Sequence, residues 1–185
     1  ALDRLLSAYG LETVLGAVVI PLLHEIGERW VAGEISVGHE HFASAVLGGR
    51  LRALGRSFDG GVGPRAVLAC PPGERHEIGL LCFGLALRHR GWQVTFLGAD
   101  TPFDAIAQAA DAVAADLVVL AAQMPGVLAD AAGAVRALGA RRPVALGGRA
   151  ATAADARRAG ARLLPDDALR AATGIAGAEG PGRHP

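Results

Sequence analysis

Apolar residues recur at helical spacing in the first third of the chain and in short continuous runs after it. Between residues 2 and 58, apolar side chains return every three or four positions, which predicts amphipathic helices. Pro21 is expected to kink or restart the helix because it lacks a backbone N–H, and Gly33 is expected to end it. Ser36 is placed to cap a further helix. Residues 1–58 are therefore predicted to form a small helical bundle.

A glycine-rich segment closed by proline, residues 59–64, separates this bundle from a different pattern. Short apolar runs predict five strands, at residues 65–70, 93–97, 117–121, 144–146 and 162–164. Helical patterns alternate with them, at residues 78–90, 102–114, about 128–138, 152–159 and 166–175. This alternation predicts an α/β domain over residues 65–176, with a doubly wound, Rossmann-like or flavodoxin-like parallel sheet of five strands. Residues 177–185 are expected to be a disordered tail.

Composition and charge narrow the classes of function. The 185 residues include 18 basic and 18 acidic side chains, so the formal net charge is zero. No basic stripe suggests contact with nucleic acid within this chain, and no apolar run reaches the ~20 residues of a membrane span. The two cysteines, Cys70 and Cys82, fall on a predicted strand and a predicted helix. These features favour a cytoplasmic protein. Because the sequence starts at Ala1 without an initiator Met, we expect it to be part of a longer protein.

The candidate chemistry lies in the loop after the first predicted strand. Glu74 and His76 stand in this loop, and Gly79 follows in the first turn of the next helix. In an open parallel sheet such loops gather at the carboxyl edge of the strands, where ligands bind. A neutral His76 can ligate a metal, and Glu74 can accept the other ring proton and fix the tautomer. On spacing alone, a loop histidine that caps the helix is the simpler interpretation.

The other strand ends carry small residues in place of phosphate-binding motifs. The loops after the second, third and fourth strands begin with Gly98, Asp100 and Thr101, with Ala121, Ala122 and Gln123, and with Gly147 and Gly148. Neither Gly-x-Gly-x-x-Gly nor a phosphate-binding loop with its lysine occurs, which disfavours dinucleotides and nucleoside triphosphates. Two adjacent glycines let a flat group lie close to the backbone, although they are also common in tight turns.

Together these residues resemble the cobalamin-binding domain. That family carries Asp-x-His-x-x-Gly, then Ser-x-Leu or Ser-x-Thr after the third strand, then Gly-Gly after the fourth. The matching positions, within about residues 65–164, are Glu74, His76, Gly79, Ala121, Gln123, Gly147 and Gly148. The resemblance implies that His76 ligates cobalt from the lower face while the cofactor's tail enters a slot at the sheet edge. Ala121 lacks the serine hydroxyl, ordinarily a loss of about 1 kcal/mol.

The helical segment narrows the resemblance to the CarH-type regulators, light-responsive repressors with a MerR-like DNA-binding domain. Trp30, a gap of nine residues and then Glu40-His41 are similar to the cap of that group, as is Leu-Gly-x-Asp-Thr-Pro at residues 97–102. The resemblance implies that the bundle covers the upper face of adenosylcobalamin. The same residues favour this ligand without the resemblance: the indole ring of Trp30 offers a flat apolar surface for stacking, and the carboxylate of Glu40 can accept hydrogen bonds from a ribose diol. Each residue alone is more simply explained as a core aromatic or a solvated charge.

Position 31 departs from that group. CarH-type proteins carry a histidine directly after the cap tryptophan, and it takes the upper cobalt position after illumination. Valine cannot ligate a metal, so Val31 implies that this product does not form here by the usual route. Whether His24, His39 or His41 takes over that role stays open.

The predicted function is a non-enzymatic sensory domain of a transcription regulator, adenosylcobalamin-dependent and light-responsive. DNA contact is expected only through a DNA-binding domain absent from this chain, and a homo-oligomer is expected. The alternatives are a corrinoid carrier for methyl transfer and a fold that has lost its cofactor. The predicted cofactor site comprises Trp30, Val31, Val37, Glu40, His41, Glu74, Arg75, His76 as the cobalt ligand, Glu77, Ile78, Gly79, Gly98, Asp100, Thr101, Ala121, Ala122, Gln123, Gly147 and Gly148.

Overall fold

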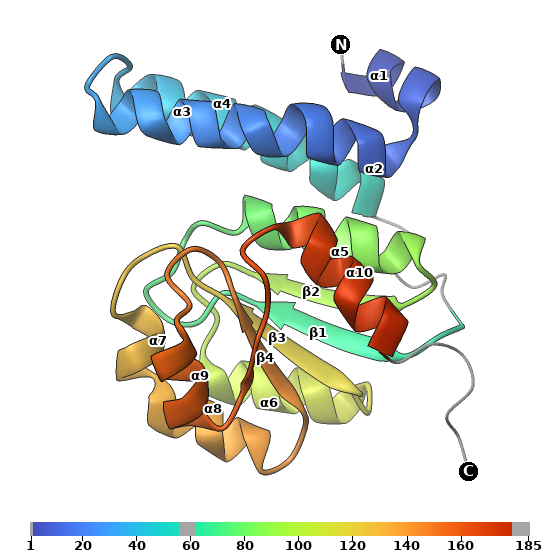
Figure 1. Cartoon of the computed structure of the whole chain (residues 1–185), viewed down its shortest axis with the longest axis vertical. Coiled ribbons are helices and arrows are strands. Elements are labelled where there is room, and N and C mark those ends of the chain that lie inside the picture. Colours follow the sequence, from blue (N-terminus) through green and yellow to red (C-terminus); the bar gives the residue numbers. More distant parts are fainter. Residues whose placement is uncertain (1, 56–61, 179–185) are drawn as a thin grey trace. The chain divides into compact units, whose positions relative to one another are not determined.

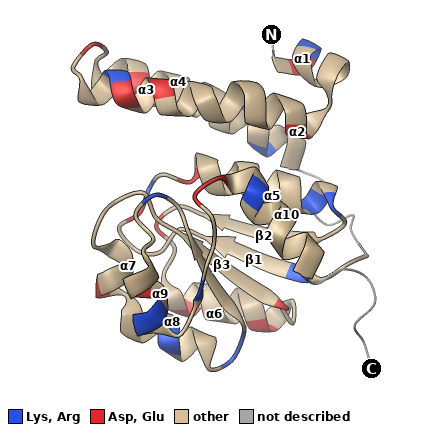
Figure 2. Ribbon diagram, viewed as in Figure 1, with Lys and Arg blue, Asp and Glu red and all other residues tan. Residues whose placement is uncertain are grey.

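The computed structural model describes residues 2–55 and 62–178 and divides the chain into two units, Ala1–Arg56 and Ser57–Pro185 (Figure 1). The predicted segment 59–64 falls partly outside the described residues. Acidic and basic side chains are interspersed on both units (Figure 2). Within the described residues, no helix is long and apolar enough to cross a membrane.

The first unit is helical, as predicted. Its elements are α1 (Leu2–Tyr9), α2 (Leu11–Val14), the π-helical turn η1 (Leu15–Val19), α3 (Ile20–Val31) and α4 (Val37–Leu54). Pro21 lies in the first turn of α3, directly after η1, so the helix restarts where the proline removes an N–H donor. Gly33, at φ 73°, follows α3, and the Ser36 hydroxyl accepts the His39 N–H at the start of α4.

The second unit is built on a five-stranded parallel sheet, which confirms the predicted fold class. The strands are β1 (Arg65–Ala69), β2 (Gln93–Gly98), β3 (Leu117–Ala121), β4 (Val144–Gly147) and β5 (Arg162–Leu163). Their order is β2-β1-β3-β4-β5, that of the flavodoxin-like doubly wound sheet. Every residue of β3 and β4 is buried, which explains why both strands appear in the sequence as continuous apolar runs.

Helices cover both faces of this sheet (Figure 1). One face carries α5 (Ile78–His89) and α10 (Ala168–Ala178), and the other carries α6 (Phe103–Ala112), α7 (Val127–Asp130), α8 (Ala132–Gly139) and α9 (Ala153–Ala159). The helix predicted at 128–138 is wrong as a single element, because Ala131, at ψ 0°, separates α7 from α8. The predicted tail also begins too early, since α10 runs to Ala178; residues 179–185 lie outside the described part.

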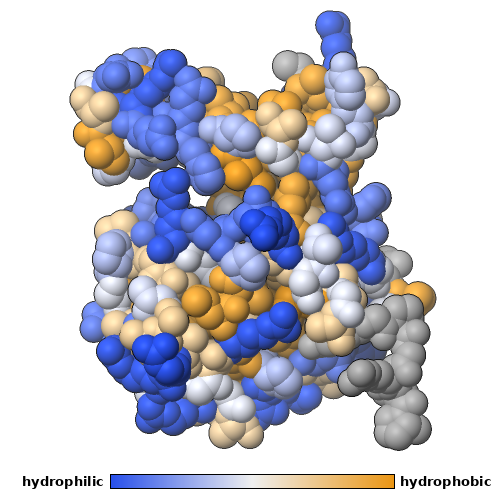
Figure 3. Space-filling view, in the orientation of Figure 1, coloured by the Kyte–Doolittle hydropathy of each residue, from blue (hydrophilic) through white to orange (hydrophobic). Residues whose placement is uncertain are grey.

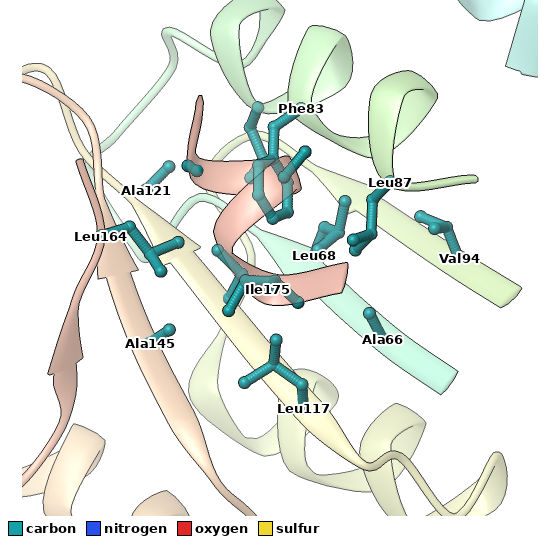
Figure 4. Packing of buried hydrophobic residues seen from close by; sticks show 14 of the residues in the cluster. Ala66, Leu68, Phe83, Leu87, Val94, Leu117, Ala121, Ala145, Leu164 and Ile175 are labelled. Atoms are coloured by element: carbon teal, nitrogen blue, oxygen red, sulfur yellow. The ribbon is translucent and has the colours of Figure 1, made fainter. Parts of the chain in front are cut away.

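Side chains that alternate along the strands form two hydrophobic clusters. Leu68, Phe83 and Ile175 belong to the cluster under α5 and α10 (Figure 4). Val67 and Leu120 belong to the cluster on the other face, together with residues of α6, α8 and α9. Since both faces are covered, the edges and end loops of the sheet are the surfaces left for binding.

Candidate functional site

The loop between β1 and α5, residues 70–77, lies at the point where the strand order reverses. β1 pairs with β2 on one side and with β3 on the other. The chain leaves β1 for α5 on one face of the sheet and leaves β3 for α7 on the opposite face (Figure 1). In doubly wound sheets, the crevice between two such strand ends is where ligands bind.

Glu74 is the buried centre of this loop, with no exposed surface. Its Oε1 accepts hydrogen bonds from the backbone N–H of His76 at 2.8 Å and from the ring Nδ1 of His76 at 2.6 Å. Its Oε2 accepts hydrogen bonds from the backbone N–H groups of Gln123 at 2.6 Å and Met124 at 2.8 Å. Four donors therefore surround one carboxylate, as a buried charge requires.

These donors also decide the charge of Glu74. Burial by itself raises the pKa of a carboxyl group, because it disfavours the ionised form. The hydrogen bonds from the backbone of His76, Met124 and Gln123 and from the His76 ring outweigh burial, so the pKa of Glu74 is lowered. Glu74 is therefore an ionised acceptor at neutral pH.

His76 presents one ring nitrogen to the outside of the loop. Its side chain is 57% exposed, and its Nδ1 faces Glu74. A carboxylate at Nδ1 favours the tautomer with the proton there, which leaves the Nε2 lone pair for a ligand. Among the described residues, no cluster of three or more His, Cys, Asp and Glu side chains that could hold a metal ion is found. A single imidazole with a free Nε2 suits a metal whose other ligands belong to its own cofactor.

The loop after β2 makes hydrogen bonds to the β1–α5 loop, on the side of that loop away from β3. Asp100, at the positive φ of 50°, accepts the Gly73 N–H on Oδ1 at 2.8 Å and donates its own N–H to the Glu74 carbonyl oxygen at 2.8 Å. The Thr101 N–H donates to the Cys70 carbonyl oxygen at 2.9 Å. Asp100 and Thr101, two predicted cofactor residues, thus have a visible role in supporting the loop of His76.

Two predicted glycines, Gly98 and Gly148, are required by the backbone itself. Both have positive φ, of 90° and 87°. A Cβ at Gly148 would overlap the backbone of Ala122, whose carbonyl carbon would lie 2.9 Å away, and a Cβ at Gly98 would lie 2.7 Å from Oε2 of Glu77. The positive φ of both residues, and at Gly148 also the close approach of the Ala122 backbone, explains these glycines without any ligand.

The other two, Gly79 and Gly147, have no such constraint. A Cβ at Gly147 would come no closer than 3.7 Å to Leu164, and one at Gly79 no closer than 3.8 Å to Gln123, both ordinary contacts. The absent side chains at these positions therefore leave space that the fold alone does not need.

The remaining predicted residues of this unit are divided between loop and core. Arg75 is exposed, Glu77 precedes α5 and accepts the Leu81 N–H, and Ile78 begins that helix. Ala121 points into the cluster under α5 and α10. Ala122 belongs to the opposite cluster, so the structure does not bring the side chains of Ala121 and Ala122 together on one face.

The predicted residues of the helical unit gather where α3 ends and α4 begins. Trp30 and Val31 end α3, and a short turn joins them to Val37, Glu40 and His41 in the first turns of α4. Trp30 is 47% exposed and Val31 is 79% exposed. Oε2 of Glu40 lies 2.6 Å from Nδ1 of His41, and the Ser44 hydroxyl donates to Oε1 of Glu40 at 2.7 Å.

Sequence reasoning missed Met124. It named Gln123 for its place in the motif, yet the groups that matter are the backbone N–H groups of both residues. A backbone donor leaves no trace in a pattern of side chains. The one available signal was the length of Glu74, which has one methylene more than aspartate and can reach farther.

Comparison with protein families and curated proteins follows this division of the chain. The B12 binding domain family matches residues 64–178, and a second B12 binding domain family matches residues 1–54. The HTH-type transcriptional repressor CarA of Myxococcus xanthus is 42% identical over 120 residues, which is 64% of this chain and 40% of CarA. CarH of the same organism is 40% identical over 119 residues, with the same two coverages. The chain thus spans about two fifths of the length of these relatives.

Solved structures share the fold. A cobalamin-binding protein from Desulfitobacterium hafniense DCB-2 is 25% identical, with a TM-score of 0.57 over 83% of this chain and 76% of that chain. The monomethylamine corrinoid protein of Methanosarcina barkeri is 16% identical, with a TM-score of 0.79 over 96% of this chain and 88% of that chain. The second likeness shows a common arrangement of elements.

Proposed function

The chain belongs to the B12 binding domain family, and from that premise we propose that it is the cobalamin-binding sensory part of a transcription regulator, with His76 as the lower axial ligand of cobalt. Its relation to the CarA and CarH repressors supports the regulatory role and a non-enzymatic one. DNA would be contacted by another domain, as the names of these relatives imply, and a homo-oligomer is proposed.

The contact between Glu74 and His76 carries this proposal. Bound cobalamin would supply the cobalt ion and its reactive axial bond, and the protein would supply an oriented imidazole. The ionised carboxylate of Glu74 accepts a hydrogen bond from Nδ1–H of His76, which keeps the ring proton on Nδ1. The lone pair on Nε2 of His76 is then the one that can ligate cobalt. A histidine that only capped α5 would not require a fully buried carboxylate with four donors.

The space at Gly147 supports a slot for the cofactor's tail. Gly147 and Ala121 end adjacent strands, and Leu164 is the nearest side chain to the missing Cβ of Gly147. Ala121 and Leu164 belong to the cluster under α5 and α10 (Figure 4). We propose that the tail enters along this face of the sheet and that Gly79 lets the cofactor approach the first turn of α5.

For the upper ligand we propose adenosyl rather than methyl, and hence a light-responsive domain of the CarH type. The half-exposed indole of Trp30 offers a surface on which adenine can stack, and Glu40 offers acceptors for a ribose diol. Val37 and His41 flank Glu40 on the same helix. A methyl group would use neither stacking nor hydrogen bonding, so these residues argue against the alternative, a corrinoid carrier for methyl transfer.

Absorbance spectroscopy tests the lower ligand. Hydroxocobalamin is titrated into the wild-type protein, into His76→Ala and into His89→Ala, a control at the exposed far end of α5. Wild type and His89→Ala should show the spectral change of imidazole ligation and retain the cofactor through gel filtration. His76→Ala should bind at least ~100-fold more weakly, since even loss of a group behind a ligand costs 10–100-fold. Full loading of His76→Ala contradicts the assignment.

A further inference from the structure

Helices α6, α8 and α9 end at the amino edge of the sheet, at the far end of the strands from His76. Parallel strands place their amino ends at one edge, and each of these helices leads from the carboxyl edge back to it. Arginines gather there, from the start of β1, from α8 and α9 and from the loop before β4 (Figure 2). We define the amino-edge arginines as Arg65, Arg136, Arg141, Arg142, Arg157 and Arg158.

We propose that the amino-edge arginines form a surface that binds the phosphate backbone of duplex DNA. The inference rests on the proposed regulatory function for the identity of the polyanion, because the sensory part of a repressor works close to DNA. Contacts to phosphate carry no sequence information. The surface therefore adds affinity to that of the separate domain that would recognise the DNA sequence.

The charge of this region is one-sided. Residues 131–165 include seven arginines and one acidic residue, Asp155, which is buried. The whole chain has a formal net charge of zero, so the positive excess is local. Small and apolar residues separate these arginines in the sequence, and Arg65 joins them only because β1 pairs with β3 and β3 with β4. This explains why the sequence shows no basic stripe.

The carboxylates near this edge leave the surface positive. Among the described residues, Asp111 forms ion pairs with both Arg141 and Arg142, the second at 3.6 Å. Oδ2 of Asp116 accepts the backbone N–H of Arg65 at 2.8 Å. One carboxylate is thus shared by two guanidinium groups, and the other is engaged by a main-chain donor.

Backbone carbonyl groups orient other members of the set. Arg136 donates to the carbonyl oxygen of Arg158, and Arg65 donates to that of Val113 at 3.0 Å. Arg158 also lies 4.0 Å from Asp155, whose carboxylate belongs to the capping box of α9. The ends of helices favour cations, so these contacts fix the guanidinium groups without cancelling their charge. A guanidinium has five N–H donors, which leaves donors for phosphate oxygens.

This surface and the proposed cofactor site lie at opposite ends of the unit. β1 and β3, of five residues each, separate the two edges by roughly 17 Å, so DNA and cobalamin can be bound at the same time. The carboxyl edge carries Glu74, Glu77 and Asp100, whose charges disfavour DNA there. The distribution of charge therefore specifies which end of the unit faces DNA.

Fluorescence anisotropy with a labelled duplex of arbitrary sequence, about three helical turns long, tests the surface. Between about 50 and 200 mM salt, wild-type affinity should fall on the order of 100-fold, as expected for about four phosphate contacts. Arg157→Ala combined with Arg158→Ala should weaken binding at least ~10-fold at the lower salt and reduce the salt slope by roughly 2. Both side chains are exposed and alanine favours helix, so the urea unfolding midpoint should not change.

A matched control removes the same charge from the carboxyl edge. Arg149→Ala combined with Arg170→Ala, both at exposed positions, should change duplex binding by less than ~2-fold. Equal binding by wild type and by both double variants would overturn the proposal.

Asp111→Asn tests the surface by a gain. It frees Arg141 and Arg142 from their shared carboxylate and should strengthen duplex binding ~3-fold or more. Asp130→Asn, on exposed α7, adds the same charge elsewhere and should have little effect. Equal affinities of Asp111→Asn and Asp130→Asn would contradict the assignment of the site to the amino edge.

Competition identifies the partner, and cobalamin binding is scored separately. Unlabelled duplex should displace the probe at a charge concentration at least ~10-fold below that of polyglutamate, because duplex DNA carries one charge per ~1.7 Å of its axis. Equal potency would assign the surface to an acidic protein and overturn the proposal. If wild type ligates hydroxocobalamin through His76 but does not bind the duplex, this inference fails and the proposed function stands. If it binds the duplex but not hydroxocobalamin, the proposed function fails and the surface stands.

Discussion

The two units of the chain differ in how far they bury and fix the residues proposed to bind the cofactor. In the α/β unit, Glu74 is fully buried with four donors, and Asp100 ties down the same loop. In the helical unit, Trp30, Val31 and Val37 are 47%, 79% and 53% exposed. Apolar residues accordingly appear at the surface of the helical unit (Figure 3).

This difference separates two sources of binding energy. Groups held in place by the fold lose little conformational freedom when a ligand arrives, so His76 is prepared to bind tightly. Exposed apolar side chains contribute only when a ligand removes their surface from water. We therefore expect changes to the buried, hydrogen-bonded groups of the α/β unit, such as Glu74, to affect stability and affinity together, and changes at Trp30 to affect affinity alone.

The two adjacent glycines sharpen this comparison most strongly. Gly148→Ala should destabilise the protein by at least ~2 kcal/mol, because alanine at φ 87° is strained and its Cβ overlaps the backbone of Ala122. Gly147→Ala should change stability by less than ~1 kcal/mol and weaken hydroxocobalamin binding, since its Cβ occupies the proposed slot. Urea unfolding and absorbance titration measure the two effects. Equal stabilities would mean that Gly148 is not required by packing.

Trp30 tests the other side of the comparison. Trp30→Ala should weaken adenosylcobalamin binding about tenfold, a loss of ~1.4 kcal/mol in the range of aromatic stacking, and leave the unfolding midpoint unchanged. Methylcobalamin binding should be unaffected, which calorimetry in the dark can establish. Equal affinities of wild type for the two forms, insensitive to Trp30→Ala, would favour the methyl carrier.

A substitution at Val31 should strengthen the retention of cobalamin after illumination. After illumination, wild type should lose cobalamin on desalting several-fold faster than Val31→His, because only histidine offers a nitrogen to the upper position. Val31 is 79% exposed, so the substitution should not disturb the fold. Spectra recorded before and after light compare the two products. A bis-imidazole spectrum in illuminated wild type would mean that another histidine serves, and His41→Ala would be the next variant.

The smallest effect in this series is the reaction of the two cysteine thiols of the native protein with an alkylating reagent. Burial raises the pKa of Cys82 to about 12, so roughly one thiol in ten thousand is ionised at pH 8. Cys70 is buried as well, and its pKa is also raised to about 12, by burial and by the charge of Glu74. Neither thiol should react with iodoacetamide at pH 8 until the protein unfolds, as mass spectrometry can show. Rapid labelling of the native protein would mean that the α/β unit opens far more readily than its packing implies.

The fold could be predicted largely because the sheet is buried on both faces. The predicted bounds of β3 agree with the structure, since a fully buried parallel strand is a run of apolar residues with clear ends. The break between α7 and α8 could not be predicted, because Ala131 is a good helix former and nothing in its identity indicates ψ 0°.

The candidate site was predictable only where side chains meet over a short separation. The contact between Glu74 and His76 follows from their spacing in one loop. The bonds from Glu74 to the backbone of Gln123 and Met124 depend on the pairing of β1 with β3, and the role of Asp100 depends on its positive φ. Neither is visible in the pattern of residue types.

The short strand β5 has a consequence for the protein in the cell. An exposed sheet edge is a template for strand addition and aggregation, and short edge strands and charged side chains reduce that hazard. β5 contains only two residues, Arg162 and Leu163, and Pro165 follows closely after it. A neighbouring molecule therefore finds almost no backbone to pair with at this edge, which lowers the tendency of this edge to add a strand from another chain.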